Sequence, residues 1–167
     1  MATTPYSTQT DLENLVSVAQ LAELANDTAG ASSADPTIVA ALINRADRII
    51  DSKAGQVYTV PFDPTPTTGN CTAIPSLVAE ISKTYAIYFA MLRRFGVTGV
   101  SKDWQAMKAD ADQMLDDISN ELVQLDGSPT VASQETSMVT PTSDAMTDFY
   151  DVYNPLNDFI DDSMGNI

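Results

Sequence analysis

The sequence predicts an all-α protein, a small antiparallel helical bundle with a projecting proline-rich loop and an extended C-terminal arm. Two observations lead to this prediction. Apolar residues recur at spacings of three and four in three long stretches before residue 127, and the composition changes to Ser, Thr, Pro and Val after it. The 167 residues, 44% of them hydrophobic, suffice for one modest core. We therefore expect a helical domain over residues 1–127, with a loop at 56–73, and an acidic arm over residues 128–167.

Helix-start signals place the first three helices. Thr10 and Ser17 each precede a Glu or Gln by three residues, a spacing that satisfies the free amides at a helix start, so two short helices are predicted there. Asp35 followed by Pro36 predicts the start of a longer helix that ends near Gly55. Its expected inner face is Ile38, Leu42, Ala46, Ile49 and Ile50, and its outer face is mainly Asn44, Arg45, Asp47, Arg48 and Asp51.

The stretch that follows Gly55 cannot continue a helix. It holds a run of strand-forming residues and then Pro61, Pro64 and Pro66. Apolar side chains on an extended segment gain little unless another surface buries them. We therefore expect the loop over residues 56–73 to contact a neighbouring subunit or a tail protein, and docking onto its own helices is the alternative. The expected contact residues are Tyr58, Val60, Pro61 and Phe62.

Two more long helices complete the predicted bundle. Pro75 begins a helix that is apolar around much of its circumference and should be central, and it ends at Gly96 and Gly99. Ser101 caps the last helix, which is expected to run to residue 126. Its predicted apolar stripe is Trp104, Met107, Ala111, Met114, Leu115, Ile118, Leu122 and Leu125. Trp104 and the two methionines are therefore interpreted as core residues.

The C-terminal arm combines a polar stretch with a group of apolar residues near its end. Residues 128–145 are polar, contain two prolines and show no apolar period, so they should run extended over another surface. We expect the apolar group to bind a partner; docking back onto the helices is the alternative. The group is Phe149, Tyr150, Tyr153, Leu156, Phe159 and Ile160.

Composition argues against several function classes. The net charge is −15, and all eight basic residues lie between Arg45 and Lys108, so ordinary binding to nucleic-acid phosphates is not expected. The chain has no His and one Cys, Cys71, which has no neighbouring cation in sequence to activate it. No cofactor motif is present, and no stretch predicts a secretion signal or a membrane span. We expect an intracellular or assembled protein that is not an enzyme, needs no cofactor and contacts no membrane.

One cluster of carboxylates could suggest a metal site. It consists of Asp110, Asp112, Asp116, Asp117 and Glu121. Carboxylates on one helix would need further oxygen ligands from elsewhere to complete the coordination of Mg²⁺ or Ca²⁺. A solvated acidic helix face is therefore the preferred interpretation, and no metal is expected.

Several segments together resemble a known family. They are "TPYSTQTDLENL", "SVAQLAELAND", "DPTIVAALINRADRIIDSKAGQVYTVPF", "IPSLVAEISKTYAIYFAML" and a last amphipathic helix that ends in "QLDG". Over residues 5–127 they resemble the head-tail adaptors of tailed bacteriophages, the head-completion or connector proteins, including those of Mu-like phages. The most specific element is a helix with Ala46 and Asp51 that leads to Tyr58-x-x-Pro61.

The resemblance implies a structural role in the virion neck. In this family a helical bundle with a projecting loop assembles as a ring, typically twelve-fold, below the portal vertex. The implied partners are the portal protein, a tail or head-completion (stopper) protein and further copies of the chain, with DNA only passing through the channel. The protein would be assembled in the host cytoplasm, and the arm would dock on the portal.

The sequence is also compatible with two rival functions. One is a monomeric acidic binding module, such as a DNA mimic or an inhibitor of a basic protein, which the net charge would suit. The other is an enzyme that uses the carboxylates between Asp110 and Glu121 with a divalent ion. Ring assembly would favour the adaptor, a stable monomer bound to a basic protein would favour the mimic, and metal-dependent turnover would favour the enzyme.

Overall fold

The computed structural model describes residues 4–28, 30–65, 69–126, 128 and 130. The helices, in chain order, are α1 (Gln9–Val16), α2 (Val18–Leu24), α3 (Pro36–Ala54), α4 (Ser76–Phe95), the 3-10 helix η1 (Val97–Gly99) and α5 (Lys102–Ser119). Among the described residues no strand forms, and Tyr58 and Thr130 make only an isolated antiparallel bridge. The predicted all-α bundle is therefore confirmed.

The first two helices begin at hydroxyl caps. Ser17 caps α2 as expected, but α1 is capped by Thr8 and not by Thr10. The Thr8 hydroxyl accepts a hydrogen bond from the amide of Asp11 (3.3 Å), and the Asp11 carboxylate accepts one from the amide of Thr8 (2.8 Å). The Thr8 hydroxyl also donates to the Asp11 carboxylate at 2.6 Å, and this bond, followed by the one from the Thr8 amide, lowers the pKa of Asp11. Asp in the third helical position thus closes a reciprocal cap, where the prediction considered only Glu and Gln.

The bounds of α3 follow from its end residues. The Asp35 carboxylate accepts a hydrogen bond from the amide of Thr37 at 2.8 Å, and Pro36 is the first helical residue, as predicted. Gly55 is the C-cap. A Cβ at this position would lie 2.7 Å from the carbonyl oxygen of Asp51, so the close return of the chain requires glycine.

Helices α4 and α5 are joined by a tight connection in which Gly96 has a φ of 70°. Ser101 caps α5, but this helix ends at Ser119 and not near residue 126. The predicted apolar period was misleading here, because the chain turns back at Glu121 (φ 60°). Leu122 is consequently 74% exposed, whereas Leu125 is buried again beyond the turn.

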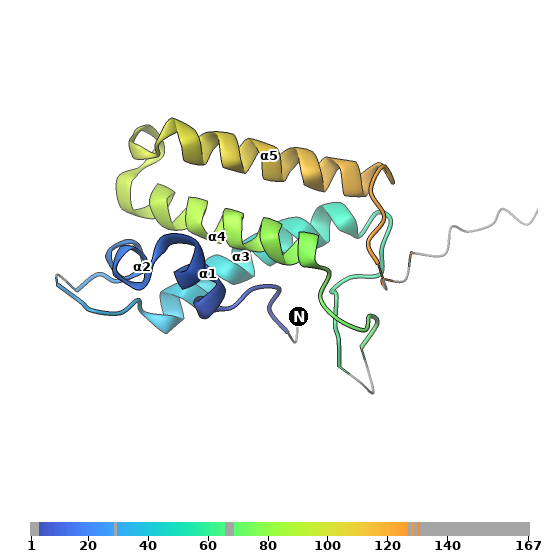
Figure 1. Ribbon diagram of the computed structural model, residues 1–167, viewed down its shortest axis with the longest axis horizontal. Helices are drawn as coiled ribbons and strands as arrows, with labels where there is room; N and C mark the ends of the chain where they lie inside the picture. Colours follow the sequence, from blue (N-terminus) through green and yellow to red (C-terminus); the bar gives the residue numbers. More distant parts are fainter. Residues whose placement is uncertain (1–3, 29, 66–68, 127, 129, 131–167) are drawn as a thin grey trace, which may run out of the picture. The chain divides into compact units, whose positions relative to one another are not determined.

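Helix α4 lies at the centre of the bundle and packs against α3, α5, α1 and α2 (Figure 1). Val78, Ile81, Tyr85 and Phe89 are among its buried side chains. This arrangement confirms the prediction of a central helix. Helices α3 and α5 each keep exposed residues, such as Ala41 and Arg48 on α3 and Gln105 and Asp110 on α5.

Candidate functional site

The loop over residues 56–73 docks onto its own helices through its aromatic side chains. Tyr58 is 2% exposed and Phe62 is fully buried, and both belong to the hydrophobic core. The Phe62 ring lies 5.6 Å from that of Tyr6 and 6.2 Å from that of Tyr58, measured between centroids. The expectation that Tyr58 and Phe62 contact a neighbouring protein is therefore corrected. Val60 is half-buried against the same core, and Pro61 is half-buried after a cis peptide bond.

Tyr58 also holds the segment that follows α5. Its hydroxyl accepts a hydrogen bond from the amide of Leu125 at 3.0 Å and donates one to the carbonyl of Val123 at 3.5 Å. The aromatic half of the loop thus holds the segment after α5, in which Val123 and Leu125 lie 65 and 67 residues from Tyr58 in sequence. The sequence contained a signal for this role, because a tyrosine keeps a polar end that finds a partner when its ring is buried.

The outer part of the loop is polar. The Asn70 side chain donates hydrogen bonds to the carbonyls of Thr59 and Pro61, both at 2.8 Å, and accepts one from the amide of Asp63 at 2.8 Å. Gly69 closes the turn, since a Cβ there would lie 2.1 Å from the carbonyl oxygen of Asp63. In the described part of the loop, Asp63, Pro64 and Thr65 are half-buried and Thr59 and Gly69 are exposed. The exposed positions of the described loop, Gln56, Thr59, Gly69, Thr72 and Ala73, thus carry no large apolar side chain.

A buried polar network lies beneath the loop. Asp47, predicted to lie on the outer face of α3, is 2% exposed. Its carboxylate accepts hydrogen bonds from the Ser82 hydroxyl (2.7 Å) and from the amide of Tyr6 (3.2 Å). Because Ser82 donates to Asp47, Ser7 donates to Ser82, with 2.9 Å between their oxygens. This part of the network joins the N-terminal segment, α3 and α4.

Tyr6 extends the network to the loop. Its hydroxyl donates to the Asp51 carboxylate and accepts a hydrogen bond from the amide of Phe62 at 2.9 Å. Burial, followed by the hydrogen bond to Asp51, raises the pKa of Tyr6. Burial also raises the pKa of Asp47 and of Asp51, although the hydrogen bonds that each accepts oppose the shift. Each of these hydrogen bonds joins two groups of the chain itself. The network therefore stabilises the contacts among the N-terminal segment, α3, α4 and the loop.

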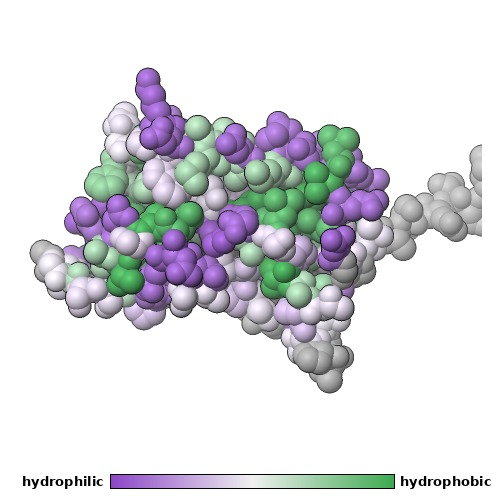
Figure 2. All heavy atoms as spheres, in the orientation of Figure 1, coloured by the Kyte–Doolittle hydropathy of each residue, from purple (hydrophilic) through white to green (hydrophobic). Residues whose placement is uncertain are grey.

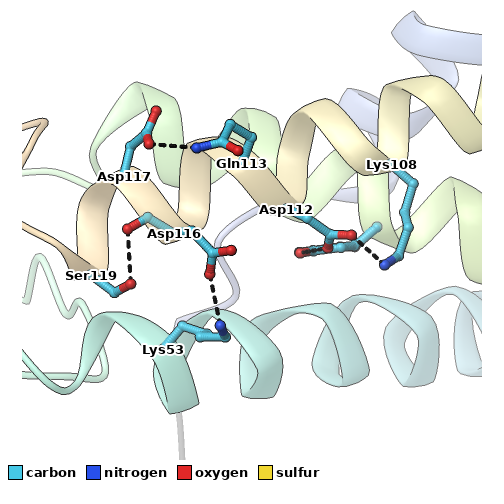
Figure 3. Close-up of polar contacts among 8 residues, drawn as sticks. Lys53, Lys108, Asp112, Gln113, Asp116, Asp117 and Ser119 are labelled. Carbon is cyan, nitrogen blue, oxygen red and sulfur yellow. Dashed lines mark hydrogen bonds and ion pairs between the residues drawn. The ribbon is translucent and has the colours of Figure 1, made fainter.

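Most of the carboxylates of α5 are paired with groups of the same chain (Figure 3). Asp112 accepts hydrogen bonds from the Tyr85 hydroxyl (2.6 Å) and from Lys108 (2.5 Å). Asp116 pairs with Lys53 of α3 at 2.7 Å, and Asp117 accepts from Gln113 at 2.7 Å. No group of three or more potential ligand residues in the described part of the chain could hold a metal ion. Asp112 and Asp116 thus link α5 to α4 and to α3, and the carboxylates together make this face of α5 acidic.

Cys71 is half-buried, and burial raises the pKa of its thiol, with the nearby charge of Asp63 contributing in the same direction. A raised pKa disfavours the reactive thiolate. The environment of this cysteine is thus that of a packing residue, as its sequence neighbourhood indicated.

The two methionines predicted to lie in the core are exposed. Met107 is 38% and Met114 is 43% exposed, while Trp104 is half-buried. With Leu77 and Ile81 of α4, the methionines line a groove of about 290 Å³ between α4 and α5. Figure 2 shows hydrophobic residues gathered over α4 and its border with α5. The apolar spacing of α5 predicted that these methionines face the core. They lie at the edge of the buried stripe, where spacing alone does not separate buried from exposed positions.

A second apolar groove, of about 270 Å³, is lined by Leu15 of α1, Met91 and Phe95 of α4 and Trp104 of α5. Phe95 is 49% exposed. A third groove, of about 420 Å³, lies between the N-terminal segment and the first turns of α3. The described surface therefore offers apolar contact areas, and it offers no assembled set of catalytic groups.

The residues predicted to bind a partner through the arm, Phe149, Tyr150, Tyr153, Leu156, Phe159 and Ile160, lie outside the described residues. In the described part of the chain no helix is both long and apolar enough to cross a membrane. The structure thus leaves the grooves, the exposed polar residues of the loop, such as Thr59 and Thr72, and the acidic face of α5 as the described candidate contact surfaces.

Comparison with known proteins places the chain in a family. A search of the curated proteins found no match. The family model described as "Bacteriophage Mu, Gp36" matches residues 6–141, which include every helix of the bundle. This match indicates a protein of Mu-like phages with a structural or morphogenetic role. The chain belongs to the bacteriophage Mu Gp36 family.

Proposed function

We propose that the protein is a structural head-tail adaptor of a Mu-like phage. It forms a ring below the portal, joins the DNA-filled head to the tail and lets the genome pass. The observation that carries the proposal is the family match over residues 6–141. The all-α bundle with one central helix supports it, because a connector needs a rigid scaffold whose outer faces remain available for neighbours.

Charge supports the same proposal. Five of the eight basic residues are engaged within the chain, four in ion pairs and Arg45 over the ring of Phe89, while exposed carboxylates such as Glu23, Glu121 and Asp126 remain unpaired among the described residues. A channel bordered by such a surface repels phosphates and gives moving DNA no lasting contact. The adaptor therefore conducts DNA without binding it.

The proposed partners are the portal protein on the head side and a tail or stopper protein on the other side. The C-terminal arm, with its seven carboxylates and six apolar anchors after residue 127, would attach the ring to a basic groove of the portal. Repetition around the ring would turn weak single contacts into a secure joint. The exposed polar residues of the described loop, such as Gln56, Thr59 and Thr72, form the surface proposed for the tail side.

Imaging of intact phage particles tests the function directly. The expected result is density for this protein in a ring at the neck, together with co-sedimentation of the purified protein with portal-bearing heads. Absence of the protein from the particle would contradict the proposal. A monomer that instead binds a basic DNA-binding protein would support the acidic binding module.

A further inference from the structure

One stripe of α5 alternates acidic and apolar side chains, and all of its members except the half-buried Asp117 are exposed. It consists of Asp103, Met107, Asp110, Met114 and Asp117, at spacings of four, three, four and three residues, and is called the acidic stripe. Asp110 is exposed and has no ion pair or side-chain hydrogen bond among the described residues. The spacing is that of residues that face a partner helix along a seam.

The acidic stripe borders the apolar groove between α4 and α5. Leu77, Glu80, Ile81 and Thr84 of α4 form the other wall of this groove. Helix α5 meets α3 through a different side, where Asp116 pairs with Lys53. The groove is thus an apolar surface that no other described helix covers, with acidic groups at its rim, a combination typical of a protein contact.

Helix α3 carries a stripe of opposite charge. Ala41, Arg45, Arg48 and Ser52 recur at spacings of four, three and four residues and are all exposed, and this set is called the basic stripe. The half-buried Ile38 and Ile49 lie along one border of it. The Arg45 guanidinium lies 4.1 Å from the centroid of the Phe89 ring, which holds it in place. Arg48 has no ion pair among the described residues.

We propose that the basic stripe of one copy docks against the acidic stripe and groove of the next copy. This inference rests on the proposed function, since it names the surfaces through which the ring would form. Both stripes have the spacing of a helix-to-helix seam, and their charges are complementary. Because the stripes lie on different faces of one subunit, the contact is heterologous, and repeated copies close into a ring when the rotation permits.

Charge also identifies the occupant of the groove. The arm of the chain carries seven carboxylates and no basic residue, so it would meet the acidic rim as a like charge. The basic stripe has the required sign and the required apolar border. A second copy of the chain therefore fits the groove better than its own C-terminal segment does.

Charge reversal tests this interface in the full chain by sedimentation velocity over a range of protein concentrations. Arg48→Glu and Asp110→Lys should each weaken self-association at least about ten-fold, because each places like charges across the seam. A chain with both changes should regain most of the association. Arg94→Glu is the matched control, since Arg94 is also exposed and unpaired among the described residues but belongs to neither stripe. It should associate like the wild type.

The apolar part of the seam needs a separate variant. Met107→Gln together with Met114→Gln should weaken association while leaving the thermal midpoint unchanged, because both side chains are already partly exposed. Leu122→Gln is the control, since Leu122 is exposed outside the groove. Unchanged association in Arg48→Glu and in the double methionine variant would overturn the interface, as would failure of the double charge reversal to restore it.

The outcomes separate this interface from the proposed function. The wild-type chain is measured alone and after incubation with portal-bearing heads. A chain that binds heads but shows no contact between copies in either condition would overturn the interface and leave the adaptor function standing. A chain that associates through the two stripes but never occurs in particles would uphold the interface and contradict the adaptor function.

Discussion

At the scale of single residues, Asp47 shows how a helix can bury a charge for structural reasons. Its carboxylate receives one hydrogen bond from α4 and one from the N-terminal segment. Asp47→Ala should lower the free energy of unfolding by about 2 kcal/mol, because the Ser82 hydroxyl and the Tyr6 amide lose their acceptor inside the core. Urea denaturation followed by circular dichroism measures this. A loss as small as that of the exposed control Asp110→Ala would contradict it.

The pH dependence of stability should also report on Asp47. Burial raises its pKa above the value in the unfolded chain, so the folded state binds the proton more tightly. The sign follows from linkage. The contribution of Asp47 protonation to the free energy of unfolding is fully present below the unfolded pKa of about 4, and it is lost as pH rises through the folded pKa. Asp47→Asn should remove this contribution. The difference in unfolding free energy between wild type and variant should therefore fall as pH rises above about 4. An unchanged difference across the acidic range would contradict the assignment.

Tyr6 is the second residue on which the network depends. Tyr6→Phe keeps the ring against Phe62 but removes the acceptor for the Phe62 amide and the donor for Asp51. The expected cost is about 1 to 3 kcal/mol of unfolding free energy, because a buried amide remains without a partner. Tyr88→Phe is the matched control, since the half-buried Tyr88 hydroxyl makes no hydrogen bond to the described residues. Equal midpoints for the two variants in thermal denaturation would argue against the role.

At the scale of elements, the loop over residues 56–73 has a structural half and an outer half. Phe62→Ala should lower the unfolding free energy by about 3 to 5 kcal/mol, because it removes a fully buried ring from the contact with Tyr6 and Tyr58. Thr59→Ala, at an exposed position of the same loop, should change it by less than about 0.5 kcal/mol. Similar denaturation midpoints for both variants would show that the loop does not support the fold.

At the scale of the whole molecule, we expect the arm to serve attachment and not folding. Removing residues 132–167 leaves all five α-helices and the Tyr58–Thr130 bridge in place, so helical content should be retained. The shortened chain should no longer remain on portal-bearing heads, because it lacks the apolar anchors of the arm. Phe149→Ala combined with Phe159→Ala should weaken attachment in the same direction. Co-sedimentation equal to that of the full chain would refute this role.

The sequence by itself determined the helices and most of their ends. Helix starts and stops depend on signals within one segment, such as Asp35-Pro36 at the start of α3 and Gly55 and Gly96 at the ends of α3 and α4. The central position of α4 follows from the spacing of its apolar residues, which also lies within one segment. The resemblance over residues 5–127 likewise indicated a protein of Mu-like phages, and the family match over residues 6–141 supports this part of it. These properties can be predicted without knowing which segments contact each other in the folded protein.

Only the tertiary structure decided which polar and aromatic groups are buried. Asp47 lies on a helix face that reads as polar, yet Ser82 and Tyr6, 35 and 41 residues away in sequence, bring the hydrogen bonds that permit its burial. Tyr58 and Phe62 reach the core because Tyr6 and the segment after α5 converge on the loop. Met107 and Met114 stay exposed because no described element covers that border of α4 and α5. A periodic pattern records the tendency of one helix, whereas burial depends on partners that come from distant parts of the chain.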